Sequence, residues 1–206
     1  MSAGGITNAI IAAGGRASRF GCISPKSMLT VNGVPLIIYT VKSILNAGIT
    51  RIIVCLNRPE WRREMARSLE NIPEIEMVID KGCPSTFLLA REVAPLVGHR
   101  FLFAYGHAPR PVDHISQVLE SNKPIVATCV RRSSKVRTIP WGGNQFLEPP
   151  YLLDSYDLDK GDFYEWDEFF QYHRRDLRTV PVIGPHEFNF QREFKSYRKY
   201  VLAMVY

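Results

Sequence analysis

The chain has 206 residues, of which 46% are apolar and 22% charged, ordinary values for a globular domain with enough chain to bury a core. No apolar run approaches the roughly 18 residues that a membrane-spanning helix needs, and the first residues lack the pattern of a secretory signal. We therefore expect a cytoplasmic protein without a membrane partner.

The formal net charge of +6 favours anionic partners, either a phosphorylated small molecule or a nucleic acid. Basic residues cluster only in short runs such as WRREMAR and HRRDLR, where acidic residues interrupt them. We interpret these runs as solvated faces, so nucleic acid is the less favoured partner. The four cysteines show no CxxC spacing, which argues against a zinc site and favours reduced thiols.

Apolar segments of strand length alternate with segments of helical length along the first 130 residues. These strands are rich in Ile and Val, as is typical of strands buried on both faces, and the helical segments open with Pro at or near their first position. The alternation predicts an α/β protein with a Rossmann-like, doubly wound, mostly parallel sheet and helices on both faces. The predicted strands are 6–13, 50–56, 74–80, 100–106 and 123–130, and the predicted helices are 35–48, 59–71, 84–98 and 111–121.

The pattern changes after residue 130. Residues 131–154 contain Gly-Gly and Pro-Pro and predict an irregular loop with short strands. A helix over 162–176, a short strand over 178–184 and a helix over 191–204 complete the chain. No repeat or long linker divides it, so we predict one domain over 1–206. The sequence leaves the oligomeric state open.

The stretch GGRASRFGCISPK, residues 14–26, follows the first predicted strand. Its glycines allow the backbone to approach a ligand closely, and its basic side chains offer charge to a phosphate. The stretch fits neither GxGxxG nor the P-loop pattern, and a surface loop with solvated arginines is the alternative. Its position favours phosphate binding, because doubly wound sheets bind ligands at the carboxyl ends of their strands.

Residues 9–55, AIIAAGGRASRFG…SPKSMLTVNGVPLIIYTVKSILNAGITRIIVC, resemble the N-terminal signature of the nucleotidyltransferase superfamily. That superfamily includes sugar-1-phosphate nucleotidylyltransferases and molybdopterin-nucleotide transferases. The resemblance implies an enzyme that moves a nucleoside monophosphate from a nucleoside triphosphate to a sugar 1-phosphate or similar phosphorylated acceptor and releases pyrophosphate. It also implies a nucleotide-binding half over 1–130 and an acceptor half over 131–206.

The resemblance implies roles for individual residues on the nucleotide side. Arg19 would hold the leaving pyrophosphate, and Lys26 would neutralise charge that develops at the α-phosphate, as phosphoryl-type transfer requires. The turn in DKGCPSTFLLA, residues 80–90, matches the segment that receives the base and ribose, although Ser-Thr at this place is also an ordinary helix N-cap. The implied nucleotide-binding residues are Ala13, Gly14, Gly15, Arg16, Gly82, Ser85 and Thr86.

The metal site departs from the family pattern. The family's carboxylate, in a motif such as YGDxP, is replaced by His107 in AYGHAPRP, and Asn189 matches a second ligand position. The family implies Mg²⁺, which prefers oxygen, whereas Mn²⁺ accepts imidazole. Three interpretations of His107 stay open: a ligand for a softer metal, an imidazolium that binds phosphate, or a lost metal site. The last would make the chain a catalytically degenerate nucleotide or nucleotide-sugar binding protein with a regulatory role.

The acceptor side carries a second departure. FLEPPY, residues 146–151, resembles the sugar-enzyme motif F-x-E-K-P, with Pro149 in place of the lysine. The resemblance makes Glu148 a candidate acceptor-binding residue. Trp141, beside Gly142, is a candidate wall of a sugar site, although packing is the more ordinary role of a tryptophan.

Overall fold

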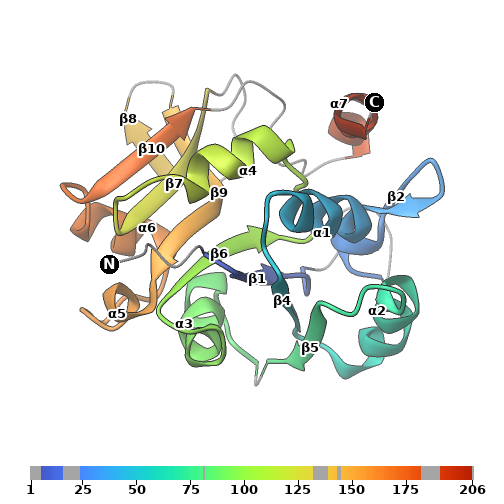
Figure 1. Cartoon of the computed structure of the whole chain (residues 1–206), viewed down its shortest axis with the longest axis horizontal. Helices are drawn as coiled ribbons and strands as arrows, with labels where there is room; N and C mark the ends of the chain where they lie inside the picture. Colours follow the sequence, from blue (N-terminus) through green and yellow to red (C-terminus); the bar gives the residue numbers. More distant parts are fainter. Residues whose placement is uncertain are drawn as a thin grey trace.

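The structure is a computed structural model of the whole chain, and it describes residues 6–15, 24–80, 82–131, 139–142, 145–181 and 191–205. In this part of the chain, strands form one large sheet in the order β10–β7–β9–β6–β1–β4–β5, and β8 pairs with β9 (Figure 1). The strands of this sheet are β1 (Asn8–Ala12), β4 (Arg51–Leu56), β5 (Ile75–Ile79), β6 (Arg100–Tyr105), β7 (Ile125–Arg131), β8 (Ile139–Gly142), β9 (Gln145–Asp154) and β10 (Leu177–Pro181).

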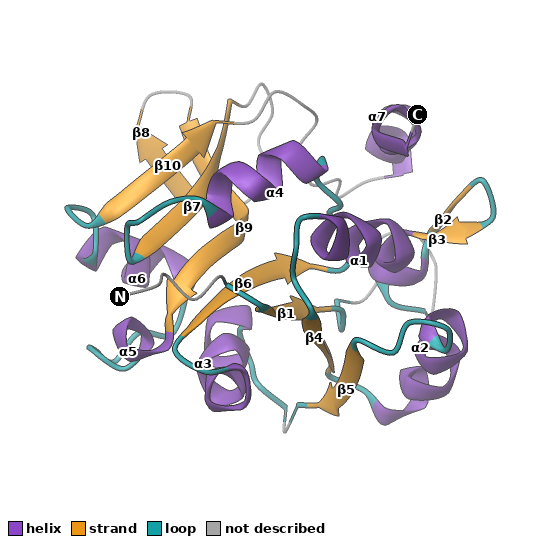
Figure 2. Ribbon diagram, in the orientation of Figure 1, coloured by secondary structure: helices purple, strands orange, loops and turns teal. Residues whose placement is uncertain are grey.

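Helices cover both faces of the sheet, and a small hairpin lies beside α1 (Figure 2). The hairpin consists of β2 (Thr30–Val31) and β3 (Val34–Pro35), and two 3-10 helices are η2 (Lys26–Met28) and η3 (Pro59–Trp61). The helices are α1 (Leu36–Asn46), α2 (Arg62–Leu69), α3 (Thr86–Val97), α4 (Val112–Leu119), α5 (Ser155–Leu158), α6 (Trp166–Tyr172) and α7 (Gln191–Val205). None of these described helices combines the length and apolar character needed to cross a bilayer.

Alternate side chains of the central strands enter two separate cores. In β1, Ile10 packs into a cluster with side chains of α3 and α6, while Ile11 packs into a cluster with α1, α2 and α4. Both side chains are fully buried, as the period of two in a strand and helices on both faces require. A third, smaller cluster joins Tyr197 and Val201 of α7 to the hairpin and to α1.

The sheet is mostly parallel, and β9 is its central exception. β1 runs parallel to β4 and β6, and β10 runs parallel to β7, whereas β9 lies antiparallel between β6 and β7. The predicted doubly wound fold is thus confirmed, together with the strands and helices predicted before residue 130. The predicted helix 59–71 is shorter than expected, because its first residues form the 3-10 helix η3 and α2 begins only at Arg62.

The prediction of an irregular loop with short strands over 131–154 was wrong for its second half, because β9 is ten residues long and crosses the middle of the sheet. The short strand β8 agrees with it, and residues 132–138 and 143–144 lie outside the described residues. Proline lacks the N–H that a central strand contributes to its ladder. A register shift accommodates the two prolines: Ala127 pairs with Tyr151, but the next residue, Thr128, pairs with Glu148. The two prolines between them therefore lie in a bulge. The helix predicted over 162–176 is also shorter, since a capping box at Glu165 begins α6.

Candidate functional site

The glycine loop after β1 lies where the strand order reverses, between β4 and β6, which is the usual ligand position in such sheets. Ala13 donates a backbone hydrogen bond to the Cys55 carbonyl at 2.9 Å, which holds the loop against β4. A Cβ at Gly14 would lie 2.7 Å from the backbone nitrogen of Asn57, so the chain needs glycine there. Among the described residues, nothing would lie within 4 Å of a Cβ at Gly15, so none of them fills the space on this side of the loop.

Lys26 lies directly beside this loop. Its backbone N–H donates to the Gly15 carbonyl at 2.9 Å, and the neighbouring Ser27 hydroxyl donates to the Ala13 carbonyl at 2.9 Å. Only 9% of Lys26 is exposed, so its side chain is largely buried beside the glycine loop. The structure thus brings Lys26 together with Ala13, Gly14 and Gly15. Arg16 and Arg19 lie outside the described residues.

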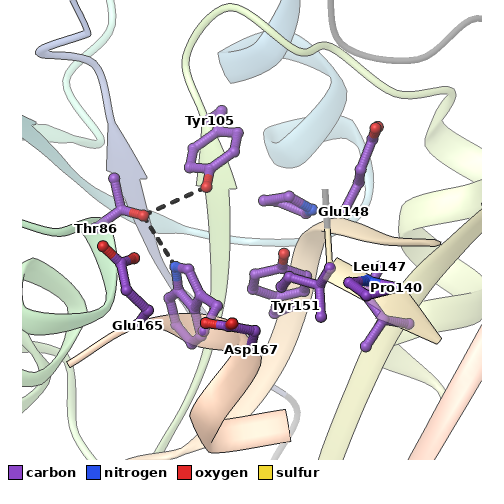
Figure 3. A pocket seen from close by; sticks show the side chains of 11 residues that line it. Thr86, Tyr105, Pro140, Leu147, Glu148, Tyr151, Glu165 and Asp167 are labelled. Carbon is purple, nitrogen blue, oxygen red and sulfur yellow. Dashed lines mark hydrogen bonds between the residues drawn. The ribbon is translucent and has the colours of Figure 1, made fainter. Parts of the chain in front are cut away.

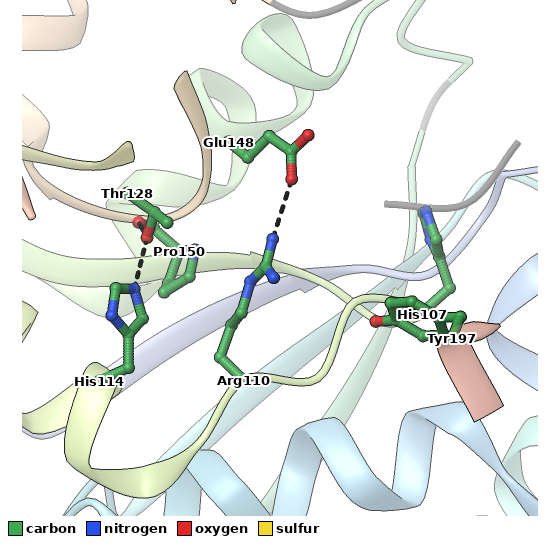
Figure 4. Close-up of polar contacts among 7 residues, drawn as sticks. All are labelled: His107, Arg110, His114, Thr128, Glu148, Pro150 and Tyr197. Atoms are coloured by element: carbon green, nitrogen blue, oxygen red, sulfur yellow. Dashed lines mark hydrogen bonds and ion pairs between the residues drawn. The ribbon is translucent and has the colours of Figure 1, made fainter. Parts of the chain in front are cut away.

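The turn after β6 adjoins the glycine loop. Gly106 donates its backbone N–H to the Ala12 carbonyl at 3.0 Å, and its own carbonyl accepts from the Thr40 hydroxyl at 3.1 Å. The His107 ring stacks on Tyr105, with centroids 5.6 Å apart and planes 6° from parallel. Tyr197 of α7 donates to the His107 carbonyl at 3.3 Å (Figure 4). His107 is therefore a buried, well-held side chain at the same edge as Lys26.

The start of α3 supplies a second wall of the site. The Ser85 hydroxyl accepts the Leu88 N–H at 3.1 Å, so Ser85 is the N-cap of α3, and it donates to the Tyr164 carbonyl at 2.5 Å. The Thr86 hydroxyl accepts from the Trp166 indole at 3.0 Å and lies 3.3 Å from the Tyr105 hydroxyl. Gly82 has a φ of +90°, a conformation that favours glycine. Ser85 is thus largely occupied by structure, whereas Thr86 faces a cavity.

This cavity has a volume of about 460 Å³ (Figure 3). None of the described residues that line it is Lys, Arg or His, and three of them are carboxylic acids. The acceptor-side candidates Trp141 and Gly142 do not line this cavity. Trp141 instead packs against the core, and the Arg174 guanidinium lies 5.2 Å from its ring centroid. The lining includes Thr86, Tyr105, Glu148, Tyr151, Trp166 and Asp167.

A buried ion pair connects the turn after β6 to β9 (Figure 4). Arg110 donates to Glu148 at 2.9 Å, and the two side chains are 2% and 3% exposed. Burial by itself lowers the pKa of Arg110, but the Glu148 carboxylate and two tyrosines of α7 outweigh it and leave this pKa above its usual value. Arg110 therefore stays charged. The sequence analysis missed Arg110, because an arginine between two prolines after a strand has no distinguishing pattern.

A second buried contact holds the same strand. His114 Nε2 lies 2.9 Å from the Thr128 hydroxyl, which donates to the Pro150 carbonyl at 3.1 Å. Since the hydroxyl proton goes to that carbonyl, His114 Nε2 carries a proton and donates. Burial, with a smaller contribution from the charge of Arg110, lowers the pKa of His114 to about 4, so the ring is neutral at pH 7.

The model of the MobA-like NTP transferase domain matches residues 9–151, which is more than half of the chain. The chain therefore belongs to the MobA-like NTP transferase domain family. No curated protein matches the chain. The resemblance seen in the sequence is confirmed, and with it the expectation that the protein is an enzyme of the nucleotidyltransferase kind.

Solved structures of low sequence identity share this fold along nearly the whole chain. The inositol-1-phosphate CTP transferase from T. maritima has a TM-score of 0.81 at 14% identity, covering 98% of this chain and 97% of that one. The 4-diphosphocytidyl-2C-methyl-D-erythritol synthase from Anaerococcus prevotii has a TM-score of 0.70 at 17% identity and 96% coverage of both chains. Rv0371c from Mycobacterium tuberculosis, in complex with manganese, has a TM-score of 0.65 at 14% identity, with coverages of 95% and 98%.

His107, at the position that the resemblance assigns to a metal ligand, carries an imidazole where a Mg²⁺ site would have a carboxylate. Among the described residues, no group of three or more His, Cys, Asp or Glu side chains could hold a metal ion. The Asp80 carboxylate is used locally, since it accepts N–H groups from Gly82 at 2.7 Å and Cys83 at 3.2 Å. Asn189 lies outside the described residues. His107 thus offers nitrogen where a hard ion would need oxygen, and this donor suits Mn²⁺ better than Mg²⁺.

Proposed function

We propose that this NTP transferase moves a nucleoside monophosphate from a nucleoside triphosphate to a phosphorylated small-molecule acceptor. A phosphate oxygen of the acceptor attacks the α-phosphate, and pyrophosphate leaves with the bonding electron pair of the broken P–O bond. The observation that supports this best is the buried Lys26 beside the open Gly15 at the topological switch point. A cation and a close-approach loop are what a triphosphate requires there.

On the nucleotide side, we assign the triphosphate to Ala13, Gly14 and Gly15, with Arg16 beside them. Lys26 and Arg19 stabilise charge at the α-phosphate and on the leaving pyrophosphate. Because Ser85 caps α3, its contribution to the base and ribose comes through the backbone that it holds, together with Gly82 and Thr86. In this assignment residues 1–130 form the nucleotide half of one domain.

On the acceptor side, we assign the cavity at Glu148 to the part of the acceptor that carries no phosphate. Its described lining holds carboxylates and hydroxyls but no basic side chain, so it suits a hydroxyl-rich group rather than an anion. A sugar 1-phosphate or polyol phosphate meets this requirement, and the T. maritima neighbour is by its title an inositol-1-phosphate CTP transferase. Trp141 and Gly142 lie next to the cavity wall in β8, since Ile139 and Pro140 line it.

We further propose that a divalent ion of the Mn²⁺ type assists the reaction, as the manganese complex of Rv0371c and the imidazole of His107 both suggest. His107 and Asn189 would hold it. Such an ion supplies positive charge that offsets the charge of the phosphates.

The test measures pyrophosphate release by the full chain with CTP, GTP, UTP or ATP, and with glucose 1-phosphate or myo-inositol 1-phosphate as acceptor. Lys26→Met should lower the rate by about 10²-fold or more, because a transition-state contact is lost. Lys42→Met, at an exposed lysine of α1, is the matched control and should keep the wild-type rate. Unchanged turnover in Lys26→Met would refute the assignment. Nucleotide binding by the wild type without pyrophosphate release would instead indicate the degenerate binding protein.

A further inference from the structure

Helix α7 contacts both of the segments that carry Lys26 and His107, which lie far apart in the sequence (Figures 1 and 4). On one side, Tyr197 of α7 is the centre of an apolar cluster against which Leu29 packs. Leu29 follows the 3-10 helix of Lys26 and donates its backbone N–H to the Lys26 carbonyl at 3.1 Å. On the other side, the Tyr197 hydroxyl donates to the His107 carbonyl at 3.3 Å. One side chain of α7 therefore connects the two segments.

The turn from Tyr105 to Ala108 is held by a different element at each step. The Ala108 N–H donates to the Tyr105 carbonyl at 3.1 Å, which closes the turn. β1 and α1 hold its Gly106, and α7 holds its His107 through Tyr197. The His107 ring lies flat on the ring of Tyr105, so its direction depends on where the His107 backbone lies.

The hydroxyl of Tyr197 is not needed to fill space. Only 1% of Tyr197 is exposed, and a phenylalanine would occupy nearly the same volume without a polar atom. A buried hydroxyl loses its contacts with water, and its hydrogen bond offsets this loss with only a small net gain in stability. What the hydrogen bond adds is direction, because it fixes the His107 carbonyl relative to the helix.

We propose that Tyr197 is a positioning residue that fixes the turn with His107 relative to the segment with Lys26. The inference rests on the proposed function, which gives both residues a part in the reaction at the phosphates. Tyr197 is buried and donates to the backbone of the turn, so it acts through His107 and does not touch a substrate. Because transfer depends on the placement of the reacting groups more strongly than binding does, loss of the hydroxyl should lower kcat and spare the KM for the nucleotide.

The test compares Tyr197→Phe with Tyr39→Phe in the full chain. Tyr39 of α1 is the matched control, because its hydroxyl donates to the carbonyl of Val31, a residue of the same cluster, at 2.9 Å. Each variant loses one tyrosine hydrogen bond to a carbonyl, so both melting temperatures should fall by about 2–4 °C. With the nucleotide and acceptor that the wild type uses best, Tyr197→Phe should lower kcat about tenfold and keep the nucleotide KM within about twofold. Tyr39→Phe should keep both values.

A second measurement does not depend on turnover. The side-chain NMR signals of His107, identified by their loss in His107→Asp, report the direction of the ring because it stacks on Tyr105. These signals should shift in Tyr197→Phe and stay in place in Tyr39→Phe.

Three results would overturn the inference and leave the proposed function intact: unshifted His107 signals in Tyr197→Phe, an unchanged kcat in that variant, or an equal loss of kcat in Tyr39→Phe. A wild type that binds nucleotide but releases no pyrophosphate would refute the proposed function, and the inference with it.

Discussion

Gly14→Ala is the substitution whose consequence follows most directly from the packing of the site. A Cβ at this position would lie 2.7 Å from the backbone nitrogen of Asn57, closer than real Cβ atoms approach. A rotamer change cannot relieve this contact, because a backbone atom makes it and β4 holds the loop through the Ala13–Cys55 hydrogen bond. Overpacking of this kind costs about 1–3 kcal/mol. In a chain of this size the melting temperature should therefore fall by roughly 2–12 °C.

The matched control is Gly15→Ala, one residue further along the same loop. No atom of the residues that the structure describes lies within 4 Å of a Cβ there, so the free energy of unfolding, measured in urea, should stay within about 0.5 kcal/mol of the wild type. Nucleotide affinity, measured by calorimetry with CTP and GTP, should nevertheless fall, because the methyl group occupies the side from which the phosphates approach. A Gly14→Ala protein that melts with the wild type would refute the packing argument. Undiminished affinity in Gly15→Ala would refute the approach of the nucleotide there.

Two further predictions concern the histidines. The His114 ring takes up a proton near pH 4 in the folded protein but near pH 6.5 when unfolded, so stability is present above pH 6.5 and is lost as the pH falls toward 4. The loss of stability from this group is roughly 3 kcal/mol. His114→Gln should remove most of this loss when the free energy of unfolding in urea is compared at pH 7 and pH 4.5. An equal loss in the variant would show that His114 is not its cause. His107→Asp should reverse a preference of nucleotide binding for Mn²⁺ over Mg²⁺ in thermal-shift titrations, and an unchanged order would exclude His107 as a ligand.

The sheet was predictable from the sequence wherever one signal dominated. Strands such as β1 and β4 are continuous apolar runs, and the helices between them start at or near prolines. The hydrophobic pattern and the helix-start signals therefore predict the same element boundaries. The sequence did not predict β9, because its Pro-Pro pair is a loop signal by every local rule. The register shift that accommodates the pair depends on the partner strand. That information is non-local, since the bulge requires β7 to lie alongside.

The candidate site was predictable to the extent that it follows from topology. Lys26, Gly14 and Gly15 meet because residues after β1 reach the carboxyl edge in any doubly wound sheet. Glu148 was predicted as a site residue from the resemblance alone, and it lines the cavity. Trp141, the other acceptor-side candidate, does not line it. The ion pair of Arg110 could not be predicted, because its partner lies 38 residues away on β9, a strand that the local sequence pattern did not predict.

The antiparallel direction of β9 explains how the two sides of the site meet. In a purely parallel sheet, only loops emerge at the carboxyl edge. β9 runs the other way, so its first residues lie at that edge, where Glu148 pairs with Thr128 of β7. The cavity that we assign to the acceptor is therefore built partly on a strand, whose backbone is held by the ladder with β7. Positions on such elements vary less than positions on loops, which matters when an attacking oxygen must lie in line with the leaving pyrophosphate. The Arg110 ion pair then ties this strand to the turn beside the glycine loop, so the function that we propose would bring its two substrates together between surfaces that are fixed relative to each other.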